Sequence, residues 1–386
     1  MHNIEEKSNT NTEKAWVVGI NFSNNKIPGA GNSAGRKEIS SHCDELSSLL
    51  TTLGVETAGS SVVSIKKPSP AFLIGKGKVE EIISNASDSD VSLIVFDDDL
   101  SPAQQKNWEK LSKKRVIDRR EVIINIFAER AKTKEASLQV ELAYCKYMQP
   151  RLTGAWKHLS RQRGGRYGTK GSGEQQIETD RRVLLKRITS LKKELANIEK
   201  QRHTRRKLRE NREVFSCSIA GYTNAGKSTL LNRLTGASVS TNNRLFDTLD
   251  PVTRKLHLPS GKEIVITDTV GFIRKLPHQL IEAFKSTLEE TVFADLVILL
   301  LDASSSEVKS HYQTSMEVLS EIGVDKENIM VLFNKADITS VHFVIPLFEQ
   351  EYSDSLFVSA LDGENIEKFI SEIEKRVAAK EVDKAK

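Results

Sequence analysis

The feature of this sequence that most restricts its fold is a glycine-rich loop between an apolar strand and a helix. Residues 214–220 (VFSCSIA) have a strand pattern and lead directly into residues 221–228 (GYTNAGKS), after which a helical pattern begins. This is the P-loop pattern in the strand–loop–helix context that it requires. The glycines let backbone N–H groups surround phosphate oxygens, Lys227 reaches the β and γ oxygens, and the Ser228 hydroxyl ligates Mg²⁺. The loop therefore predicts an α/β domain with a mostly parallel sheet, flanking helices and a nucleotide-phosphate site. The predicted phosphate-binding residues are Gly221, Tyr222, Thr223, Asn224, Ala225, Gly226, Lys227 and Ser228.

Two further segments complete the predicted phosphate and metal site. Residues 262–267 (KEIVIT) form a strand pattern that ends in Asp268 and the sequence DTVG, where Asp268 can hold a Mg²⁺-bound water and the Gly271 N–H can face the γ-phosphate. Residues 246–251 (FDTLDP) supply Thr248, the threonine that a nucleotide-sensing loop needs to close over the metal. The predicted metal ligands are Ser228 and Thr248, and the predicted catalytic residues are Lys227, Thr248 and Gly271. These segments add Phe246, Asp247, Thr248, Leu249, Asp250, Asp268, Thr269, Val270 and Gly271 to the predicted nucleotide-binding residues.

A third group of motifs identifies the base. The strand pattern at residues 329–333 delivers the sequence NKAD, and a later apolar strand delivers SAL at residues 359–361. The Asp337 carboxylate can accept two hydrogen bonds from guanine N1 and N2, whereas adenine would leave it unpaired. Together the motifs predict a guanine-nucleotide switch domain at residues 214–378 that binds GTP or GDP with Mg²⁺. The predicted base-binding residues are Asn334, Lys335, Ala336, Asp337, Ser359, Ala360 and Leu361.

The residue after the DTVG glycine is unusual for such a domain. In small GTPases a glutamine at this position orients the attacking water, but here the residue is Phe272. A phenylalanine side chain cannot orient water. We therefore expect slow intrinsic hydrolysis of GTP that depends on a partner for activation.

The chain before residue 132 is predicted to form a small α/β domain at residues 14–131. Residues 15–20 (AWVVGI) and 92–96 (SLIVF) have strand patterns, and residues 38–53 carry apolar side chains at helical spacing. Residues 75–78 (GKGK) precede a helical stretch. They can be interpreted as a phosphate-binding helix N-terminus or as a structural turn, and the turn is favoured for so short a motif.

Residues 132–213 predict an antiparallel helical hairpin with a glycine-rich tip. Helical periodicity begins at Lys132 and is expected to stop at Pro150, and it resumes over residues 174–212. In the second stretch, apolar residues follow the spacing of a coiled-coil seam. These residues are Leu184, Ile188, Leu191, Leu195 and Ile198.

Positive charge is concentrated in this hairpin. Residues 151–213 contain 19 Lys and Arg against 7 Asp and Glu, whereas the whole chain has a net charge of only +5. A solvated helix face has nearly balanced signs, so a polyanionic partner is the better interpretation. The tip, residues 161–173 (RQRGGRYGTKGSG), combines basic side chains with an aromatic ring, which suits phosphate pairing and base stacking. A generic two-helix linker is the alternative. The predicted RNA-contacting residues are Arg161, Arg163, Arg166, Tyr167 and Lys170, with Lys157 just before them.

The remaining composition excludes several classes of protein. No run of eighteen apolar residues occurs, and the polar N-terminus (MHNIEEKSNT) lacks the apolar core of a signal peptide. We therefore expect a cytoplasmic protein without stable membrane insertion, although a peripheral association with membranes is left open. Residues 1–13 are expected to be a disordered tail and residues 379–386 a charged tail. The cysteines Cys43, Cys145 and Cys217 lie too far apart for a zinc motif and are interpreted as buried apolar residues.

From residue 14 to about residue 376, the sequence resembles the HflX family of GTPases. The specific matches outside the generic motifs are residues 95–105 (VFDDDLSPAQQ), 116–120 (VIDRR), 136–142 (ASLQVEL), 168–174 (GTKGSGE) and 178–182 (ETDRR), together with 246–251. The sequence departs from the family pattern at Ser172, where proline is usual, and at Gln175, where threonine is usual.

This resemblance implies a function that composition alone only suggests. HflX-like proteins bind the large ribosomal subunit or the whole ribosome, with the loop between the two long helices entering the peptidyl-transferase region and contacting ribosomal RNA. In the GTP state they split stalled or idle ribosomes, notably under stress such as heat. The family's N-terminal domain has also been linked to ATP, for which residues 75–78 would be the candidate site. We expect a monomer.

Three functions from different classes are compatible with these features. The first is a GTPase that splits ribosomes and is released after hydrolysis. The second is a binding module in ribosome assembly or subunit silencing, in which the nucleotide gates a stable complex. The third is an RNA remodeller that uses ATP at the N-terminal site, and strict loss of activity on Asp337→Asn would count against it.

Overall fold

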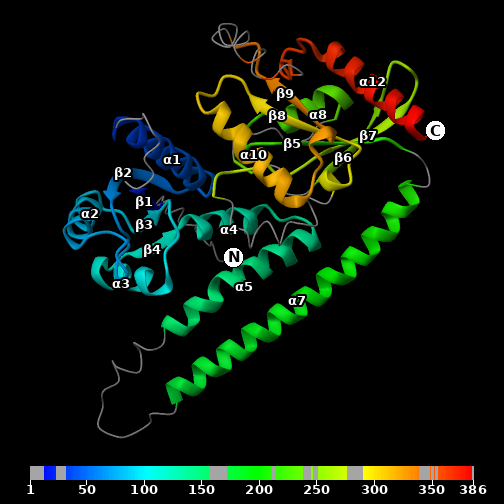
Figure 1. Ribbon diagram of the computed structural model, residues 1–386. Helices are drawn as coiled ribbons and strands as arrows, with labels where there is room; N and C mark the ends of the chain where they lie inside the picture. Colours follow the sequence, from blue (N-terminus) through cyan, green and yellow to red (C-terminus); the bar gives the residue numbers. More distant parts are fainter. Residues whose placement is uncertain are drawn as a thin grey trace, which may run out of the picture. The chain divides into compact units, whose positions relative to one another are not determined.

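The computed structural model describes residues 13–22, 32–155, 172–210, 214–237, 245–246, 251–275, 290–338, 348, 352 and 355–384 (Figure 1). The chain divides into two compact units, each built around one sheet. The first unit comprises Met1–Ile126 with Tyr144–Arg187, and the second comprises Phe127–Ala143 with Ile188–Lys386. Within the described ranges, no helix has the length and apolar character needed to cross a membrane.

The first unit contains a four-stranded parallel sheet with the order β2-β1-β3-β4. Helices alternate with the strands, as the sequence predicted. The strands are β1 (Lys14–Phe22), β2 (Glu56–Ile65), β3 (Leu93–Phe96) and β4 (Arg115–Asp118), and the helices are α1 (Asn32–Thr52), α2 (Lys76–Asp88), α3 (Pro102–Ser112) and α4 (Arg119–Arg130).

Helix α3 shows how a local signal and the core act together in this unit. Ser101 and Gln104 form a reciprocal capping box, and Pro102 occupies the first turn, where its missing N–H does no harm. The helix then buries Trp108, whose ring meets Phe96 edge-to-face at 5.0 Å. The cap therefore fixes where the helix begins, and the tryptophan fixes which face meets the sheet.

The second unit contains a six-stranded sheet with the order β10-β9-β8-β5-β7-β6, in which every pairing is parallel except that of β6 with β7. The central strand β8 reads LVILLLD and is buried on both faces over its apolar part, as expected for a strand inside a parallel sheet. The strands are β5 (Ser216–Gly221), β6 (Val252–His257), β7 (Glu263–Asp268), β8 (Leu296–Asp302), β9 (Ile329–Asn334) and β10 (Leu356–Phe357). The helices are α8 (Lys227–Thr235), α10 (Val308–Ile322) and α12 (Ile366–Lys384), with a short 3₁₀ turn, η1, at Lys326–Asn328. The predicted α/β class is confirmed.

Two long helices, α5 (Lys134–Ala155) and α7 (Ser172–Glu210), correspond to the predicted hairpin (Figure 1). Along α7, Ile188 and Leu191 are buried, and Leu184, Leu195 and Ile198 are partly buried, so the predicted seam is the least exposed stripe of the helix. Val183 and Leu185, which lie off the seam, are exposed. Residues 161–171 of the predicted tip lie outside the described residues, whereas Ser172 and Gly173 are the first residues of α7.

One predicted boundary was wrong. Pro150 does not end the helix but lies inside α5, which continues to Ala155. Arg151, the next residue, makes hydrogen bonds to α3, to β4 and to the loop before α3, and these tertiary contacts outweigh the single backbone hydrogen bond that proline removes. Helix α4 was not anticipated from the sequence at all.

Candidate GTP site

The P-loop connects the end of β5 to the start of α8 and contains two glycines that no other residue could replace without strain. Gly221 has φ +146° and Gly226 has φ +95°. A Cβ atom on Gly221 would lie 2.2 Å from the Leu300 carbonyl oxygen, and one on Gly226 would lie 2.3 Å from Asn334 Nδ2. Only glycine leaves room for the loop backbone to pass this close to Leu300 and Asn334, and this tight path is typical of a loop that wraps a phosphate.

Lys227, the first residue of α8, is buried and faces the loop. Its Nζ donates hydrogen bonds to the carbonyl oxygens of Gly221 (3.0 Å) and Tyr222 (2.8 Å). Burial lowers the pKa of this amine to about 8, and the nearby Asp268 carboxylate partly opposes the shift. A phosphate would supply the negative charge that these neutral acceptors lack. The loop also buries the Thr223 hydroxyl, which has no hydrogen-bond partner among the described residues. Both features fit a nucleotide phosphate.

The predicted metal ligand Ser228 donates its hydroxyl to Asp268 Oδ2 at 2.6 Å. Asp268 is the last residue of β7 and is fully buried, so the strand delivers the carboxylate directly to the start of α8. A hydroxyl beside a buried carboxylate is the oxygen-rich pair that Mg²⁺ takes in P-loop proteins. The donor set therefore fits the metal.

The DTVG segment is docked on the P-loop through its backbone. The Thr223 N–H donates to the Phe272 carbonyl oxygen at 2.8 Å, and the Phe272 N–H donates to the Gly221 carbonyl oxygen at 3.0 Å. Between these contacts, a Cβ on Gly271 would lie 2.8 Å from Thr223 Cγ2 and 3.0 Å from Lys227 Nζ. Glycine at 271 thus lets the backbone reach the buried amine. Thr269 is turned away, and its hydroxyl donates to the Ile219 carbonyl oxygen.

The two motifs that are predicted to bind the base meet at the P-loop. Asn334 Nδ2 donates to the Ala225 carbonyl oxygen at 2.8 Å, and Asn334 Oδ1 accepts the Ala360 N–H at 2.9 Å. The Ser359 hydroxyl donates to Asp337 Oδ1 at 2.6 Å, which orients the carboxylate predicted to read guanine. Asn334 therefore connects the three segments, and the short side chain of Ser359 holds the Asp337 carboxylate.

Two further residues of this site, Arg233 and Asp302, were not found from the sequence, although their partners were. Arg233 of α8 donates to the carbonyl oxygens of Ala360 and Leu361 and so fixes the SAL loop. Lys335 pairs with Asp302 at 2.6 Å, where β8 ends. No motif spacing links these pairs, because each joins residues at least 33 positions apart. Only the apolar run of β8, which predicts that Asp302 emerges at the carboxyl edge of the sheet, offered a signal.

Several predicted residues lie outside the described part of the chain. These are Asp247, Thr248, Leu249 and Asp250 of the sensing loop and Arg161, Arg163, Arg166, Tyr167 and Lys170 of the tip. Phe246 is described and is buried edge-to-face against Phe127, with ring centroids 4.6 Å apart. Its ring therefore anchors the start of the sensing loop, and its contact with nucleotide stays a prediction.

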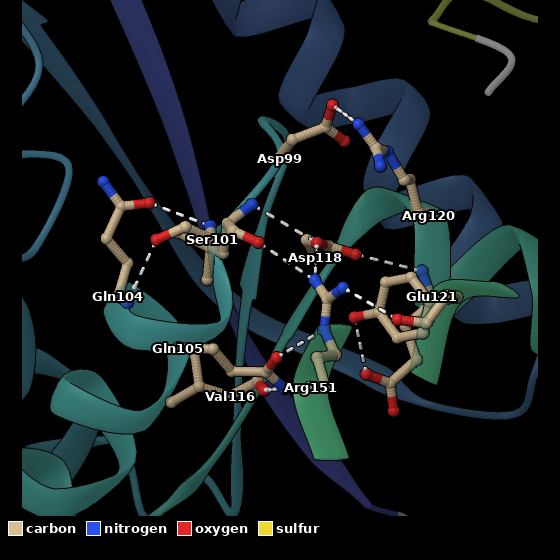
Figure 2. Close-up of polar contacts among 11 residues, drawn as sticks. Asp99, Ser101, Gln104, Gln105, Val116, Asp118, Arg120, Glu121 and Arg151 are labelled. Atoms are coloured by element: carbon tan, nitrogen blue, oxygen red, sulfur yellow. Dashed lines mark hydrogen bonds and ion pairs between the residues drawn. The ribbon is translucent and has the colours of Figure 1, made fainter. Parts of the chain in front are cut away.

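A second cluster of buried charge lies in the first unit, at the carboxyl end of β4 (Figure 2). Asp118 accepts hydrogen bonds from the Leu100 N–H (3.2 Å), the Glu121 N–H (3.1 Å) and Arg151 Nη2 (2.8 Å). The Arg151 guanidinium also donates to Gln105 Oε1 and to the Leu100 carbonyl oxygen. We refer to Leu100, Gln105, Asp118, Glu121 and Arg151 as the Asp118 network.

The Asp118 network contains family-like motifs but every described group in it meets a protein partner. Tyr147 donates its hydroxyl to Glu121, and the Arg151 guanidinium stacks 3.5 Å from the Tyr147 ring centroid. Burial raises the pKa of the Asp118 carboxyl, and Arg151 opposes that shift. The network has the character of a structural lock. Arg151 was counted among the basic residues facing a polyanion, but its charge is used inside the fold.

The lysines of the GKGK segment also have partners of their own. Gly75 is the N-cap of α2 and provides no side-chain cap. Lys78 pairs with Glu81 at 2.5 Å and Lys76 with Glu80 at 3.9 Å, all on the exposed face of that helix. These contacts suit the structural-turn interpretation, and binding of ATP stays a prediction.

Comparison with known proteins agrees with this geometry. Three family models match consecutive parts of the chain: "GTP-binding GTPase N-terminal" at residues 40–128, "GTP-binding GTPase Middle Region" at 130–209, and "50S ribosome-binding GTPase" at 216–335. The GTPase HflX of Akkermansia muciniphila is 46% identical over 345 residues, covering 88% of this chain and 77% of the relative.

Two further relatives match to a similar extent. The GTPase HflX of Spirochaeta thermophila is 45% identical over 88% of this chain and 83% of its own length, and that of Escherichia coli K12 is 41% identical over 86% and 78%. The similarity covers the first unit, the long helices and the nucleotide site alike. The DTVG segment meets the P-loop beside the buried Lys227, and Asn334 joins the NKAD and SAL segments to the same loop. Together with these relatives, this geometry shows that the chain is a GTPase and belongs to the HflX family.

Proposed function

We propose that this GTPase binds the large ribosomal subunit and, in its GTP-bound form, splits stalled or idle ribosomes, with hydrolysis of GTP allowing release. The observation that carries the switch is the docking of the DTVG backbone on the P-loop, which brings Gly271 beside Lys227. A γ-phosphate bound between Lys227 and Gly271 would hold the DTVG segment in place, and its loss on hydrolysis would release that segment. Two observations support binding to the ribosome: the matching family model is described as a 50S ribosome-binding GTPase, and the segment around the tip is basic.

We propose the following roles for the residues around the phosphates. Lys227 neutralises charge on the β and γ oxygens, and the Gly271 N–H donates to the γ-phosphate. Ser228 and Thr248 would ligate Mg²⁺, with Asp268 holding one of its waters. When bound, the metal would supply positive charge to the β and γ oxygens. Asp337 reads guanine, held by Ser359.

Phe272 explains why hydrolysis should be slow without a partner. Its side chain is 1% exposed, so it neither reaches the solvent side of the γ-phosphate nor carries a group that orients water. The group that activates the water would come from elsewhere, and we propose that ribosome binding supplies or positions it. Multi-per-second turnover by the isolated protein would contradict this proposal.

The direct test combines hydrolysis with sedimentation. GTP hydrolysis is measured for the protein alone, with large subunits and with whole ribosomes, and the same mixtures are run on sucrose gradients with a non-hydrolysable GTP analogue. We expect strong stimulation and conversion of whole ribosomes to subunits. If neither stimulation nor co-sedimentation occurs, the GTP site stands but the ribosome assignment fails.

A charge-reversal experiment distinguishes specific binding by the tip from general electrostatic attraction between the basic hairpin and RNA. The triple variant Arg163→Glu, Arg166→Glu and Lys170→Glu should abolish co-sedimentation with ribosomes while GDP affinity is unchanged. The matched control reverses Arg181, Arg182 and Lys186, which are exposed on α7 and carry the same total charge. Equal loss in both variants would show that the tip has no special role.

The alternative function is a GTP-gated assembly or subunit-silencing factor. The basic hairpin supports it equally, since immature and mature subunits both present RNA. The two functions differ in their preferred target. A splitting factor binds assembled ribosomes and separates them, whereas an assembly factor co-sediments with immature large subunits and leaves whole ribosomes intact.

A further inference from the structure

Tyr222, the second residue of the P-loop, has a side chain that connects two other elements. Its hydroxyl accepts the backbone N–H of Arg274 at 2.8 Å, three residues after the DTVG glycine. Its ring stacks on the imidazole of His311 in α10, with centroids 3.9 Å apart and planes inclined by 15°. The side chain is 5% exposed, so these contacts are shielded from water. A phosphate-binding role requires only the backbone of this residue, which leaves the side chain to be explained.

The elements that Tyr222 touches are also joined to each other. The Arg274 guanidinium makes two hydrogen bonds with the Glu307 carboxylate, at 2.8 and 3.2 Å. Glu307 is the N-cap residue of α10, where a negative charge is favoured. His311 Nε2 lies 4.0 Å from the same carboxylate, one helical turn on. Tyr222, Arg274, Glu307 and His311 thus form a closed ring of contacts, which we name the Tyr222 network.

The backbone of Tyr222 takes part in the site at the same time. Its carbonyl oxygen accepts the Lys227 ammonium at 2.8 Å, and the neighbouring Gly221 and Thr223 hold the Phe272 backbone. One residue therefore contacts the phosphate-binding lysine through its main chain and the segment after Gly271 through its side chain. The backbone directly after Gly271 is thus held at two points, at Phe272 and at the Arg274 N–H.

We infer that Tyr222 is a positioning residue for GTP hydrolysis, which fixes the backbone after the DTVG glycine so that the Gly271 N–H meets the γ-phosphate. Binding of GDP does not use that N–H, because GDP has no γ-phosphate. Loss of the tyrosine hydroxyl therefore lowers the rate of the hydrolytic step and leaves GDP affinity unchanged. This inference rests on the GTPase activity alone and does not require the ribosome.

The first measurement is kinetic. Tyr222→Phe keeps the ring stacked on His311 and removes the acceptor for Arg274. We expect its single-turnover rate of GTP hydrolysis to fall on the order of fivefold, as for one lost hydrogen bond, with GDP affinity within about twofold of the parent. Tyr222→Leu removes the stacking as well and should lower the rate further. Tyr312→Phe, one residue from His311, is the matched control and should leave the rate unchanged.

The second measurement reads the contact itself. Backbone hydrogen exchange of residues 272–275 should be faster in Tyr222→Phe than in the parent, whereas residues 329–334 of β9 should exchange equally in both. Unchanged exchange at 272–275 would show that the hydroxyl does not hold the Arg274 N–H. Equal losses of GDP affinity and hydrolysis would show that the residue supports only the loop's fold. Either result overturns the inference.

Glu307→Gln tests the far side of the network if the tyrosine variants fold poorly. It retains the shape of the side chain but weakens the paired hydrogen bonds to Arg274. We expect a smaller decrease in hydrolysis, of about two- to threefold, in the same direction and again without loss of GDP affinity. A hydrolysis rate equal to that of the parent would contradict the proposed connection to α10.

Discussion

Two aspartates occupy equivalent places in the two sheets and serve different purposes. Asp118 is the last residue of β4 and Asp268 the last residue of β7, so both lie at the carboxyl end of a parallel strand. The cation beside Asp118 is Arg151, which meets a carboxylate, an amide oxygen and backbone carbonyls (Figure 2). The cation beside Asp268 is Lys227, whose hydrogen bonds go to neutral carbonyls.

The difference between these clusters shows that position on the sheet does not by itself make a ligand site. In the Asp118 network the buried carboxylate and the guanidinium of Arg151 neutralise each other within the protein, so removing either one would leave a buried charge without its partner. At the Lys227 site, burial of the ammonium outweighs the nearby Asp268 carboxylate and lowers the pKa of the amine, so the charged lysine destabilises the fold until an anion binds. The predictions below test this contrast between a structural and a functional cluster.

The largest expected effect is on stability in the first unit. Arg151→Met leaves the buried Asp118 carboxylate without its cation and should lower the free energy of unfolding of this unit by about 3–5 kcal/mol. Trp16 and Trp108 both lie in the first unit, so tryptophan fluorescence during urea unfolding follows it. GDP affinity should not change. Arg115→Met, which breaks an ion pair that is half exposed, is the control and should cost less than about 1 kcal/mol.

The corresponding substitution in the GTPase unit should lower the rate of GTP hydrolysis instead of the stability. Lys227→Met removes the charge expected on the β and γ oxygens, and GTP hydrolysis should fall by about 10²- to 10³-fold. Unfolding of the nucleotide-free protein should not become easier, because the variant also removes a buried ammonium. If Lys227→Met instead destabilised the protein as much as Arg151→Met does, the distinction between the two clusters would be lost.

The pH dependence of the same pair sharpens the contrast. The Lys227 amine has a pKa of about 8 in the folded protein and an ordinary value of 10.5 when unfolded, so above pH 8 the folded state binds fewer protons. The stability of the parent relative to Lys227→Met should therefore rise between about pH 8 and 10.5, by up to about 3 kcal/mol. Below pH 8 the lysine is protonated in both states, so the stability difference between the two proteins should not change with pH there. Urea midpoints of both nucleotide-free proteins, followed by circular dichroism at pH 7, 8.5 and 9.5, should show the difference; a constant gap would contradict it.

The smallest expected effect is on the binding of the guanine base. Ser359→Ala removes the hydroxyl that orients Asp337, and we expect GDP affinity to weaken about fivefold, as for one hydrogen bond. Ser355→Ala is a suitable control, since that hydroxyl donates only to the Tyr352 carbonyl oxygen among the contacts described. Equal affinities of the two variants would show that Asp337 needs no support from the SAL loop.

Much of the nucleotide site could be predicted because its motifs are short and each follows a recognisable strand. The strand patterns predicted where its main residues lie, at the ends of strands or at the start of the helix after the P-loop. These residues are Gly221, Lys227, Asp268 and Asn334. The fold class followed from the same pattern of apolar strands and helices.

The misses have a common physical cause. Arg151 lies 33 residues from Asp118, and no local pattern shows that a charge in a basic segment is paired inside the fold. The same contact keeps α5 helical past Pro150, so the wrong boundary and the wrong interpretation of Arg151 share one origin. The side chain of Tyr222 was likewise hidden, since the P-loop pattern constrains only its backbone.

The length of α7 has a mechanical consequence. With 39 residues at about 1.5 Å each, the helix spans about 58 Å. A lever of that length turns a tilt of about 5° at Glu210 into a displacement of about 5 Å at Ser172, which follows the predicted RNA-contacting residues. A small tilt at one end of this helix is therefore amplified into a displacement of several ångströms at the other end.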